Sequence, residues 1–292
     1  MEIIIAENSG LCYGVKRALR IAKQTRANKS EKVYTLGDLI HNPQVIADLE
    51  KHGIHSANDL NEINKGTVII RSHGISPQIY DFLTNKKINI IDATCPIVKK
   101  IQRLVSTLSK EEEEIIIVGN KEHPEIRGLI GYSHGKGVII ENEAQARKLP
   151  QKRKRAVLVQ STQNIHLFQR IVDILSAKTK ELDIHNTICQ STQTRQKSTS
   201  ELASQVDVLF IIGGKNSSNT HTLYKISKKV LPNTYFIEKA DQITPEMLKG
   251  ASKIGLSGGA STPPKAIKEA VVKIKSSLKY LFHREKTVQC LN

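Results

Sequence analysis

Short apolar runs rich in β-branched residues alternate along the chain with longer segments in which apolar positions recur at helical spacing. The predicted strands cover residues 2–6, 32–35, 67–71, 88–92, 114–118, 138–140, 156–160, 208–212, 234–237 and 253–256. The predicted helices cover residues 13–27, 43–52, 77–86, 96–109, 124–128, 164–179, 193–204, 220–230 and 264–280. This alternation predicts an α/β fold built on mostly parallel sheets, although the residues themselves show no internal repeat.

The charge balance is strongly basic, with 44 Lys and Arg against 28 Asp and Glu, a formal net charge of +16. A surplus of this size attracts anions, whether nucleic acid, phosphorylated substrates or an acidic protein. Aromatic residues make up only 4% and the lysines are scattered along predicted helices, so we expect no nucleic-acid binding. The one dense basic run, residues 152–155, is interpreted as a surface turn.

No apolar run approaches the ~20 residues that a helix needs to cross a bilayer. The N-terminal segment combines neither a basic region nor a long apolar stretch, so we expect no signal peptide. These features predict a cytoplasmic protein that does not bind a membrane.

The chain has four cysteines, Cys12, Cys95, Cys189 and Cys290, and no pair has the CxxC spacing of a zinc ribbon. Cys12 and Cys95 follow predicted strands and open predicted helices, and Cys189 follows a weaker strand-like stretch at 182–184. A helix N-terminus favours thiolate, the form that binds metal. The first three cysteines are therefore either small buried hydrophobes or ligands that converge on one metal site.

Polar residues follow several other predicted strands, among them His41, His73 and His123. The glycine-rich loops 213–219 and 258–263 each lie between a predicted strand and a predicted helix. Backbone N–H groups in such loops, with the positive end of the next helix, suit a phosphate group. Neither loop has the Walker or dinucleotide fingerprint. A single loop of this kind is also typical of a helix cap, so the phosphate interpretation rests on the whole set.

One carboxylate, Glu125, lies beside these junctions, directly after His123 and Pro124. An acid at a helix start is commonly a favourable partner of the helix dipole. An acid among phosphate-binding groups is also suited to carrying protons. Both interpretations of Glu125 stay open at this point.

The order and spacing of these motifs resemble the IspH (LytB) family, the 4-hydroxy-3-methylbut-2-enyl diphosphate reductases of the non-mevalonate (MEP) isoprenoid pathway. The resemblance covers nearly the whole chain. The matching segments are Gly10-Leu11-Cys12-Tyr13-Gly14-Val15, His41-Asn42, Ser72-His73-Gly74, Asp92-Ala93-Thr94-Cys95-Pro96, His123-Pro124-Glu125, Ile188-Cys189 with Thr192 and Arg195-Gln196, Lys215-Asn216-Ser217-Ser218-Asn219, and Ser261.

The resemblance implies three small α/β domains in a pseudo-threefold, trefoil-like arrangement around a central cavity with an iron–sulfur cluster. The domains would cover residues 13–95, residues 96–188, and residues 1–12 together with 189–281, followed by a C-terminal tail at 282–292. Each domain would then supply one cysteine to the cluster.

The resemblance also implies how the site works. Cys12, Cys95 and Cys189 would bind one [4Fe–4S] cluster and leave one iron open, where the substrate hydroxyl binds. Glu125 and Thr162 would be catalytic, with Glu125 relaying protons so that oxygen leaves as water and isopentenyl and dimethylallyl diphosphates form. The implied substrate-binding residues are His41, His73, His123, Ser161, Thr162, Ser217, Ser218, Asn219 and Ser261.

By the same resemblance the electron donor would be a ferredoxin or flavodoxin, and both are typically acidic, so the basic surplus is expected to steer the encounter. Two alternatives stay open. Quinolinate synthases and iron–sulfur hydro-lyases also use three-cysteine clusters, but they act on carboxylates and would favour arginines, of which only Arg71 and Arg195 lie near these loops. A cluster-containing nucleic-acid-binding protein would need a binding motif such as helix-turn-helix, and none is evident.

Overall fold

The computed structural model describes residues 2–289, so Cys290 lies outside the described residues. Its strands are β1 Glu2–Ile5, β2 Val33–Leu36, β3 Ile54–Ala57, β4 Thr67–Ile70, β5 Asn89–Asp92, β6 Ile115–Val118, β7 Gly137–Ile140, β8 Lys152–Val159, β9 Thr179–His185, β10 Val208–Ile212, β11 Thr234–Ile237 and β12 Lys253–Gly258. Its α-helices are α1 Tyr13–Asn28, α2 Pro43–Lys51, α3 Pro77–Asn85, α4 Pro96–Glu111, α5 Pro124–Gly131, α6 Glu143–Lys148, α7 Ile165–Ser176, α8 Gln190–Ala203, α9 Ser218–Val230 and α10 Pro264–Gln289.

The strands form three four-stranded sheets, and every pairing between neighbouring strands is parallel. The strand orders are β3-β2-β4-β5, β7-β6-β8-β9 and β11-β10-β12-β1. The predicted α/β fold with parallel sheets is therefore confirmed. The order is the same in all three sheets, with β1 taking the place in its sheet that β5 and β9 take in theirs.

The chain divides into two compact units. One unit contains residues 1–12, 41–43 and 191–292, and with them the sheet β11-β10-β12-β1. The other contains residues 13–40 and 44–190, and with them the remaining two sheets. Each sheet lies inside one of the three expected domains. The three-domain division, the tail at 282–292 and the trefoil-like arrangement around a cavity stay predictions.

The middle sheet of the chain, β7-β6-β8-β9, shows why these sequences form these elements. Strand β6 is buried along its whole length, and its side chains alternate between two faces. Ile115 and Ile117 pack with apolar residues of α4 and α5, whereas Ile116 and Val118 pack with α6 and α7. A strand covered by helices on both faces needs apolar residues at every position, and β6 has them.

The interpretation of the basic run 152–155 as a surface turn is wrong, because these residues open strand β8. Arg155 is fully buried, and its Nε donates to Glu114 at 2.5 Å. Its guanidinium also donates to the carbonyl oxygen of Pro150 and to the Thr179 hydroxyl. A buried arginine that satisfies its donors in this way is tolerated inside a sheet, whereas composition alone indicates a solvated segment.

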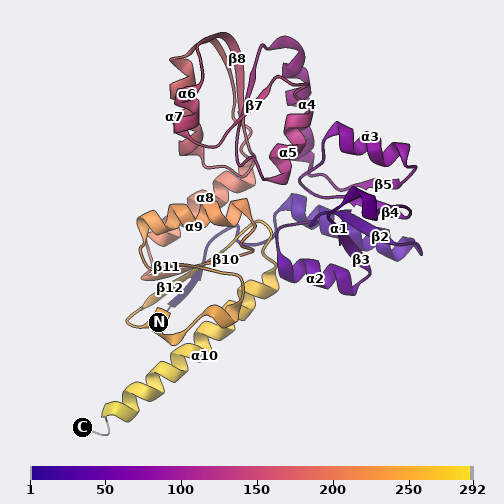
Figure 1. The fold of residues 1–292 in the computed structure, drawn as a ribbon. Coiled ribbons are helices and arrows are strands. Elements are labelled where there is room, and N and C mark those ends of the chain that lie inside the picture. The colour runs from indigo at the N-terminus through magenta and orange to yellow at the C-terminus, as the bar shows by residue number, and fades with distance from the viewer. Residues whose placement is uncertain (1, 290–292) are drawn as a thin grey trace. The chain divides into compact units, whose positions relative to one another are not determined.

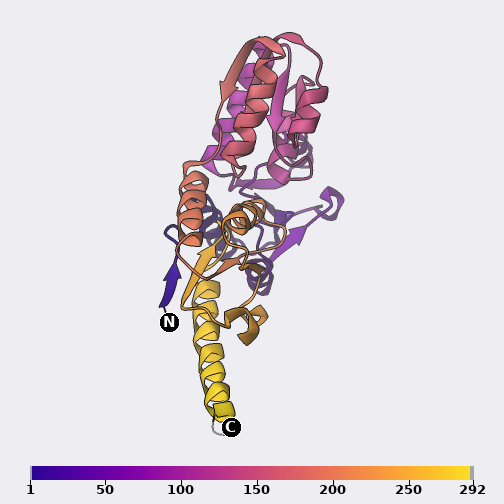
Figure 2. The same ribbon diagram turned by 90° about the vertical axis from the view of Figure 1, so that its left-hand side faces the viewer.

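The sequence prediction missed the short strand β3, the short helix α6 and the short 3₁₀ helices Leu60–Glu62, Ala240–Gln242 and Pro245–Leu248, and it gave β9 only as a weaker strand-like stretch at 182–184. Helix α7 is shorter than the predicted helix 164–179, since it ends at Ser176 and strand β9 begins at Thr179. No helix among the described residues is both long enough and apolar enough for a membrane crossing. The 26-residue helix α10 packs its first half on β12 and then continues past that sheet (Figures 1 and 2).

Candidate active site

The three motif cysteines occupy the same place in their three sheets. Each follows an edge strand, β1, β5 or β9, and lies beside the loop that leaves the neighbouring strand. Each backbone N–H donates to the carbonyl oxygen two positions past the end of that neighbour. The pairs are Cys12 with Ala260 at 3.0 Å, Cys95 with Ser72 at 3.0 Å, and Cys189 with Ser161 at 2.9 Å. The backbone thus holds each thiol in a fixed position at the carboxyl end of a sheet.

The predicted polar residues follow the same rule of position. Three positions past the ends of β4, β8 and β12 lie His73, Thr162 and Ser261. The residues five positions past the ends of β2, β6 and β10 are His41, His123 and Ser217. Glu125 and Asn219 lie seven positions past β6 and β10. Because parallel strands all end at one edge of their sheet, these residues gather at the carboxyl edge, where open α/β sheets bind ligands.

Glu125 is buried and held by one partner residue. The Ser161 backbone N–H donates to Glu125 Oε1 at 2.7 Å, and the Ser161 hydroxyl donates to Oε2 at 2.7 Å. The same Ser161 accepts the Cys189 amide through its carbonyl oxygen. A single residue therefore joins the acid to the backbone of a cysteine.

Burial raises the pKa of the Glu125 carboxyl above its ordinary value, because the charged form loses its hydration. The two hydrogen bonds from Ser161 favour the carboxylate and only partly counter this effect. A carboxyl group in this environment keeps its proton at higher pH than an exposed glutamate and is suited to act as a general acid.

Thr162 is positioned by a residue that the sequence analysis did not select. The Gln160 side-chain amide donates to Thr162 Oγ1 at 2.8 Å, and its oxygen accepts the Asn120 backbone N–H at 3.1 Å. Gln160 is fully buried. It is the last residue of the predicted strand 156–160, so its place at the end of a strand was the signal that could have identified it.

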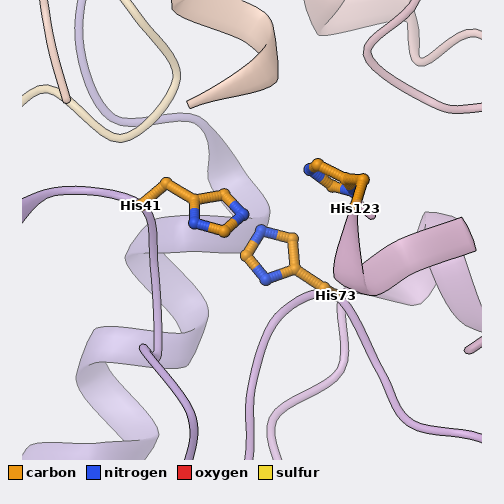
Figure 3. Close-up of side chains that lie close together, drawn as sticks. All are labelled: His41, His73 and His123. Carbon is orange, nitrogen blue, oxygen red and sulfur yellow. The ribbon is translucent and has the colours of Figure 1, made fainter. Parts of the chain in front are cut away.

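His73 and His123 lie close together in the unit that contains residues 44–190. Their ring centroids are 5.3 Å apart in an edge-to-face arrangement, with His73 on a loop and His123 at the start of α5 (Figure 3). His123 Nδ1 accepts the Glu125 backbone N–H at 3.2 Å, which caps the helix. In the neutral ring this acceptor role leaves the proton on Nε2, so His123 retains one N–H donor.

His41 belongs to the unit that also contains residues 1–12 and 191–292. Its carbonyl oxygen accepts the hydroxyl of Ser261 at 2.9 Å, which links the loop after β2 to the loop after β12. A Cβ placed on Gly214 would lie 2.7 Å from the same His41 oxygen. Only glycine allows this close approach, and the two backbones pack directly against each other.

The serine-rich loop after β10 caps α9. The Ser217 hydroxyl accepts the Thr220 backbone N–H and the Thr220 hydroxyl, at 3.3 and 3.0 Å. Ser218 is half-buried, and Asn219 is almost fully buried. Both polar atoms of the Asn219 side chain lack a hydrogen-bond partner among the described residues. A buried amide without partners is rare and commonly indicates a missing ligand or water.

Arg195 binds backbone carbonyl oxygens of the loop before Cys12. Its Nε donates to the carbonyl oxygen of Asn8 at 2.9 Å, and Nη2 donates to that of Gly10 at 2.7 Å. Gly10 has a φ of +98°, so the loop before Cys12 turns in a conformation that favours glycine. Arg195 therefore stabilises the loop that presents the first cysteine.

The family model described as LytB protein matches residues 3–275 of this chain. The chain belongs to the LytB protein family. Among LytB-family relatives, a protein of Caldanaerobacter subterraneus subsp. tengcongensis named 4-hydroxy-3-methylbut-2-enyl diphosphate reductase is 48% identical over 94% of this chain and 97% of its own length. A protein of the same name from Aquifex aeolicus is 42% identical over 94% of this chain and 96% of its own.

Solved structures agree with this membership in the LytB family. One, described as (E)-4-hydroxy-3-methyl-but-2-enyl diphosphate reductase, the terminal enzyme of the non-mevalonate pathway, is 42% identical with a TM-score of 0.68 and covers 94% of this chain and all of that one. The E-1-hydroxy-2-methyl-but-2-enyl-4-diphosphate reductase from Plasmodium falciparum is 29% identical with a TM-score of 0.89, over 92% of this chain and 86% of that one. The recognition of the family from its motifs is confirmed.

Proposed function

We propose that this chain reduces (E)-4-hydroxy-3-methylbut-2-enyl diphosphate to isopentenyl and dimethylallyl diphosphates, the last step of the non-mevalonate isoprenoid pathway. Relatives at 40–48% identity over nearly the whole chain carry the name of this reductase. The observation that carries the proposal is the repeated loop pattern, in which a cysteine and hydroxyl, imidazole or amide groups follow equivalent strands of three sheets. This set of groups suits a metal cluster and a phosphorylated ligand. It offers few of the arginines that would bind a carboxylate substrate.

The cysteines fit a [4Fe–4S] cluster by their chemistry. Cys12, Cys95 and Cys189 are in no disulfide and are only partly buried, and the backbone amide of each is already bonded. Their positions are equivalent, as three ligands of one group would require. When bound, such a cluster supplies electrons and, with three thiolate ligands, an iron that can act as a Lewis acid toward the substrate hydroxyl.

The diphosphate is assigned to the remaining polar loops. The buried amide of Asn219 has donors and an acceptor that no described protein group uses, and the neutral ring of His123 carries its proton on Nε2. Neutral donors at helix N-termini bind phosphate oxygens well, and fixing the diphosphate orients the carbon that reacts. The proposed substrate-binding residues are His41, His73, His123, Ser161, Thr162, Ser217, Ser218, Asn219 and Ser261.

Glu125 is assigned as the proton donor and Thr162 as a relay. Replacing the hydroxyl by hydrogen consumes two electrons and two protons and releases one water. The raised pKa lets the Glu125 carboxyl keep its proton to higher pH than an exposed glutamate, and Ser161 fixes the direction of both carboxyl oxygens. Gln160 orients the Thr162 hydroxyl.

Electrons for this reaction come, in this proposal, from a ferredoxin or flavodoxin. We also place the enzyme in the cytoplasm, because three cysteines that must stay reduced to bind iron suit a reducing compartment. We assign no nucleic-acid or membrane partner.

The direct test is anaerobic conversion of 4-hydroxy-3-methylbut-2-enyl diphosphate by the cluster-loaded protein with a small low-potential reductant. We expect both five-carbon diphosphates as products and none with cluster-free protein. Absence of conversion by protein with a full complement of iron and sulfide would overturn the proposed function.

A further inference from the structure

The proposed reduction needs a source of electrons, and neither glycine-rich loop has a dinucleotide fingerprint. We propose that the exposed faces of α1 and α4, here called the basic face, are the docking surface for a small acidic one-electron carrier protein. The basic face is defined by Tyr13, Lys16, Arg20, Lys23, Ile97, Lys100 and Arg103. The inference rests on the proposed function and assigns its partner surface.

Helix α1 carries an exposed basic stripe. Tyr13, Lys16, Arg20 and Lys23 recur at spacings of three and four residues and are all exposed. Residues at this spacing lie on one side of a helix, and the opposite side is buried through its small apolar residues. No residue of α1 is acidic, so the positive charges are not neutralised within the helix.

Helix α4 repeats the arrangement. Lys100 and Arg103 are exposed on one side, and Ile97 is exposed in the first turn. The one acidic residue of α4 is Glu111 at its last position. Within residues 2–279, none of the five cationic side chains of the basic face forms an ion pair with a carboxylate.

Both helices begin directly after a cysteine. Tyr13 comes directly after Cys12 in the chain, and α4 begins directly after Cys95. Arg17 of α1 donates from Nη1 to the carbonyl oxygen of Thr94 at 3.1 Å, which ties α1 to the segment just before Cys95. The basic face therefore begins beside the residues proposed to bind the cluster.

Among the described residues, helices α9 and α10 also carry exposed lysines without ion pairs, Lys225, Lys229, Lys268 and Lys275, but neither of these helices follows a cysteine. Helix α8, which follows Cys189, has Arg195 bonded to backbone carbonyls and Lys197 near Glu201. In β8, Lys152 and Lys154 are paired with Glu114 and Glu112. Among the helices that follow the three motif cysteines, α1 and α4 therefore carry the unneutralised charge.

The composition of the basic face fits a transient electron-transfer complex. Such interfaces are small, and electrostatic attraction mainly raises their rate of association. Tyr13 is 71% exposed and Ile97 is 41% exposed, so each first turn offers an apolar contact surrounded by positive charge. An acidic carrier satisfies both features, whereas an uncharged reductant gains nothing from them.

The test compares two variants with the same change in charge. Lys16→Glu/Arg20→Glu/Lys23→Glu reverses the stripe on α1, and Lys229→Glu/Lys268→Glu/Lys275→Glu reverses three exposed lysines on α9 and α10. An acidic flavodoxin and an acidic ferredoxin serve as probes. Their affinity for each cluster-free protein is measured by calorimetry at two ionic strengths, and reduction of the substrate is measured with the loaded proteins.

At low salt, we expect the α1 variant to have an affinity for the carrier, and a rate of substrate reduction with it, about 10- to 100-fold below those of the wild type. Both quantities should also depend less on salt than in the wild type. The α9/α10 variant should change by less than about threefold, the effect of net charge alone. Turnover with a small artificial reductant should be unchanged in both.

Equal losses in both variants, or no loss in the α1 variant, would overturn the docking surface while turnover with the small reductant continues. If wild-type protein with a full cluster fails to turn over with the small reductant, the proposed function fails instead. Lys16→Gln/Arg20→Gln/Lys23→Gln should show an intermediate loss, which separates lost attraction from introduced repulsion.

Discussion

The loops after β6 and β10 occupy the same place in two sheets and carry different chemistry. Glu125, seven positions past β6, is a buried acid with both oxygens bonded by Ser161. Asn219, seven positions past β10, is a buried amide whose oxygen and nitrogen have no partner among the described residues. The backbone framework is shared, and the difference lies in the side chains and their partners.

This difference separates two tasks. A buried acid that the protein itself orients is ready to deliver a proton before any ligand arrives. A buried amide without partners costs about 1–3 kcal/mol in the absence of a ligand and regains that free energy when a ligand bonds to it. We therefore propose proton delivery for Glu125 and ligand binding for Asn219.

The largest effect is expected from the loss of one of the three cysteines proposed to bind the cluster. Cys189→Ser should remove a cluster ligand and lower turnover by at least ~100-fold, beyond the losses typical of groups that only support a metal ligand. Iron and sulfide content, the absorbance of the cluster and anaerobic turnover measure the effect. Cys290→Ser makes the same substitution outside the described residues and should leave all three unchanged. A fully loaded and active Cys189 variant would contradict the cluster assignment.

The next effect concerns the acid. Glu125→Gln keeps the size of the side chain and removes its proton, so kcat should fall by about 10²–10⁴-fold while iron content is unchanged. The matched control is Glu122→Gln, an exposed residue paired with Arg127, which should alter kcat by less than about twofold. Full activity in the Glu125→Gln variant would remove Glu125 from proton delivery.

A smaller effect is expected at the buried amide of Asn219, where a substitution should raise stability and lower substrate affinity. Asn219→Leu removes the two unpartnered atoms, so the ligand-free protein should gain about 1 kcal/mol in free energy of unfolding. The affinity for the substrate should fall about 10- to 100-fold, because the hydrogen bonds to the ligand are lost. Chemical denaturation and calorimetry measure the two quantities. Asn233→Leu makes the same change at an exposed position and should shift stability by no more than ~0.5 kcal/mol.

The smallest effect is the pH dependence of stability. The folded protein holds the Glu125 proton to higher pH than the unfolded chain, because burial raises the pKa of this carboxyl. The free energy of unfolding should therefore decrease as pH rises from the ordinary glutamate pKa through the raised one. Glu125→Gln should lack this decrease, and the two proteins should converge in pH dependence below the ordinary value. Parallel curves across the whole range would contradict the raised pKa.

The sequence predicted the parts of this comparison that depend on local pattern. Alternating strands and helices, the cysteines at strand ends and the glycine-rich loop before Ser217 are all properties of short segments. The bond between Ser161 and Glu125 joins residues 36 positions apart, and the burial of Asn219 depends on packing around its helix. The prediction of a surface turn at 152–155 was wrong because a run of charged residues by itself indicates exposure. Glu114, which is distant in sequence, supplies the partner that allows Arg155 to be buried.

We infer that equivalent positions in two sheets divide proton delivery from ligand binding. This division is tested most directly by measuring substrate affinity and the single-turnover rate in Glu125→Gln and Asn219→Leu side by side, with cluster content matched. We expect the first variant to keep its affinity and lose rate, and the second to lose affinity and keep most of its rate once saturated. Loss of the same quantity in both variants would contradict it.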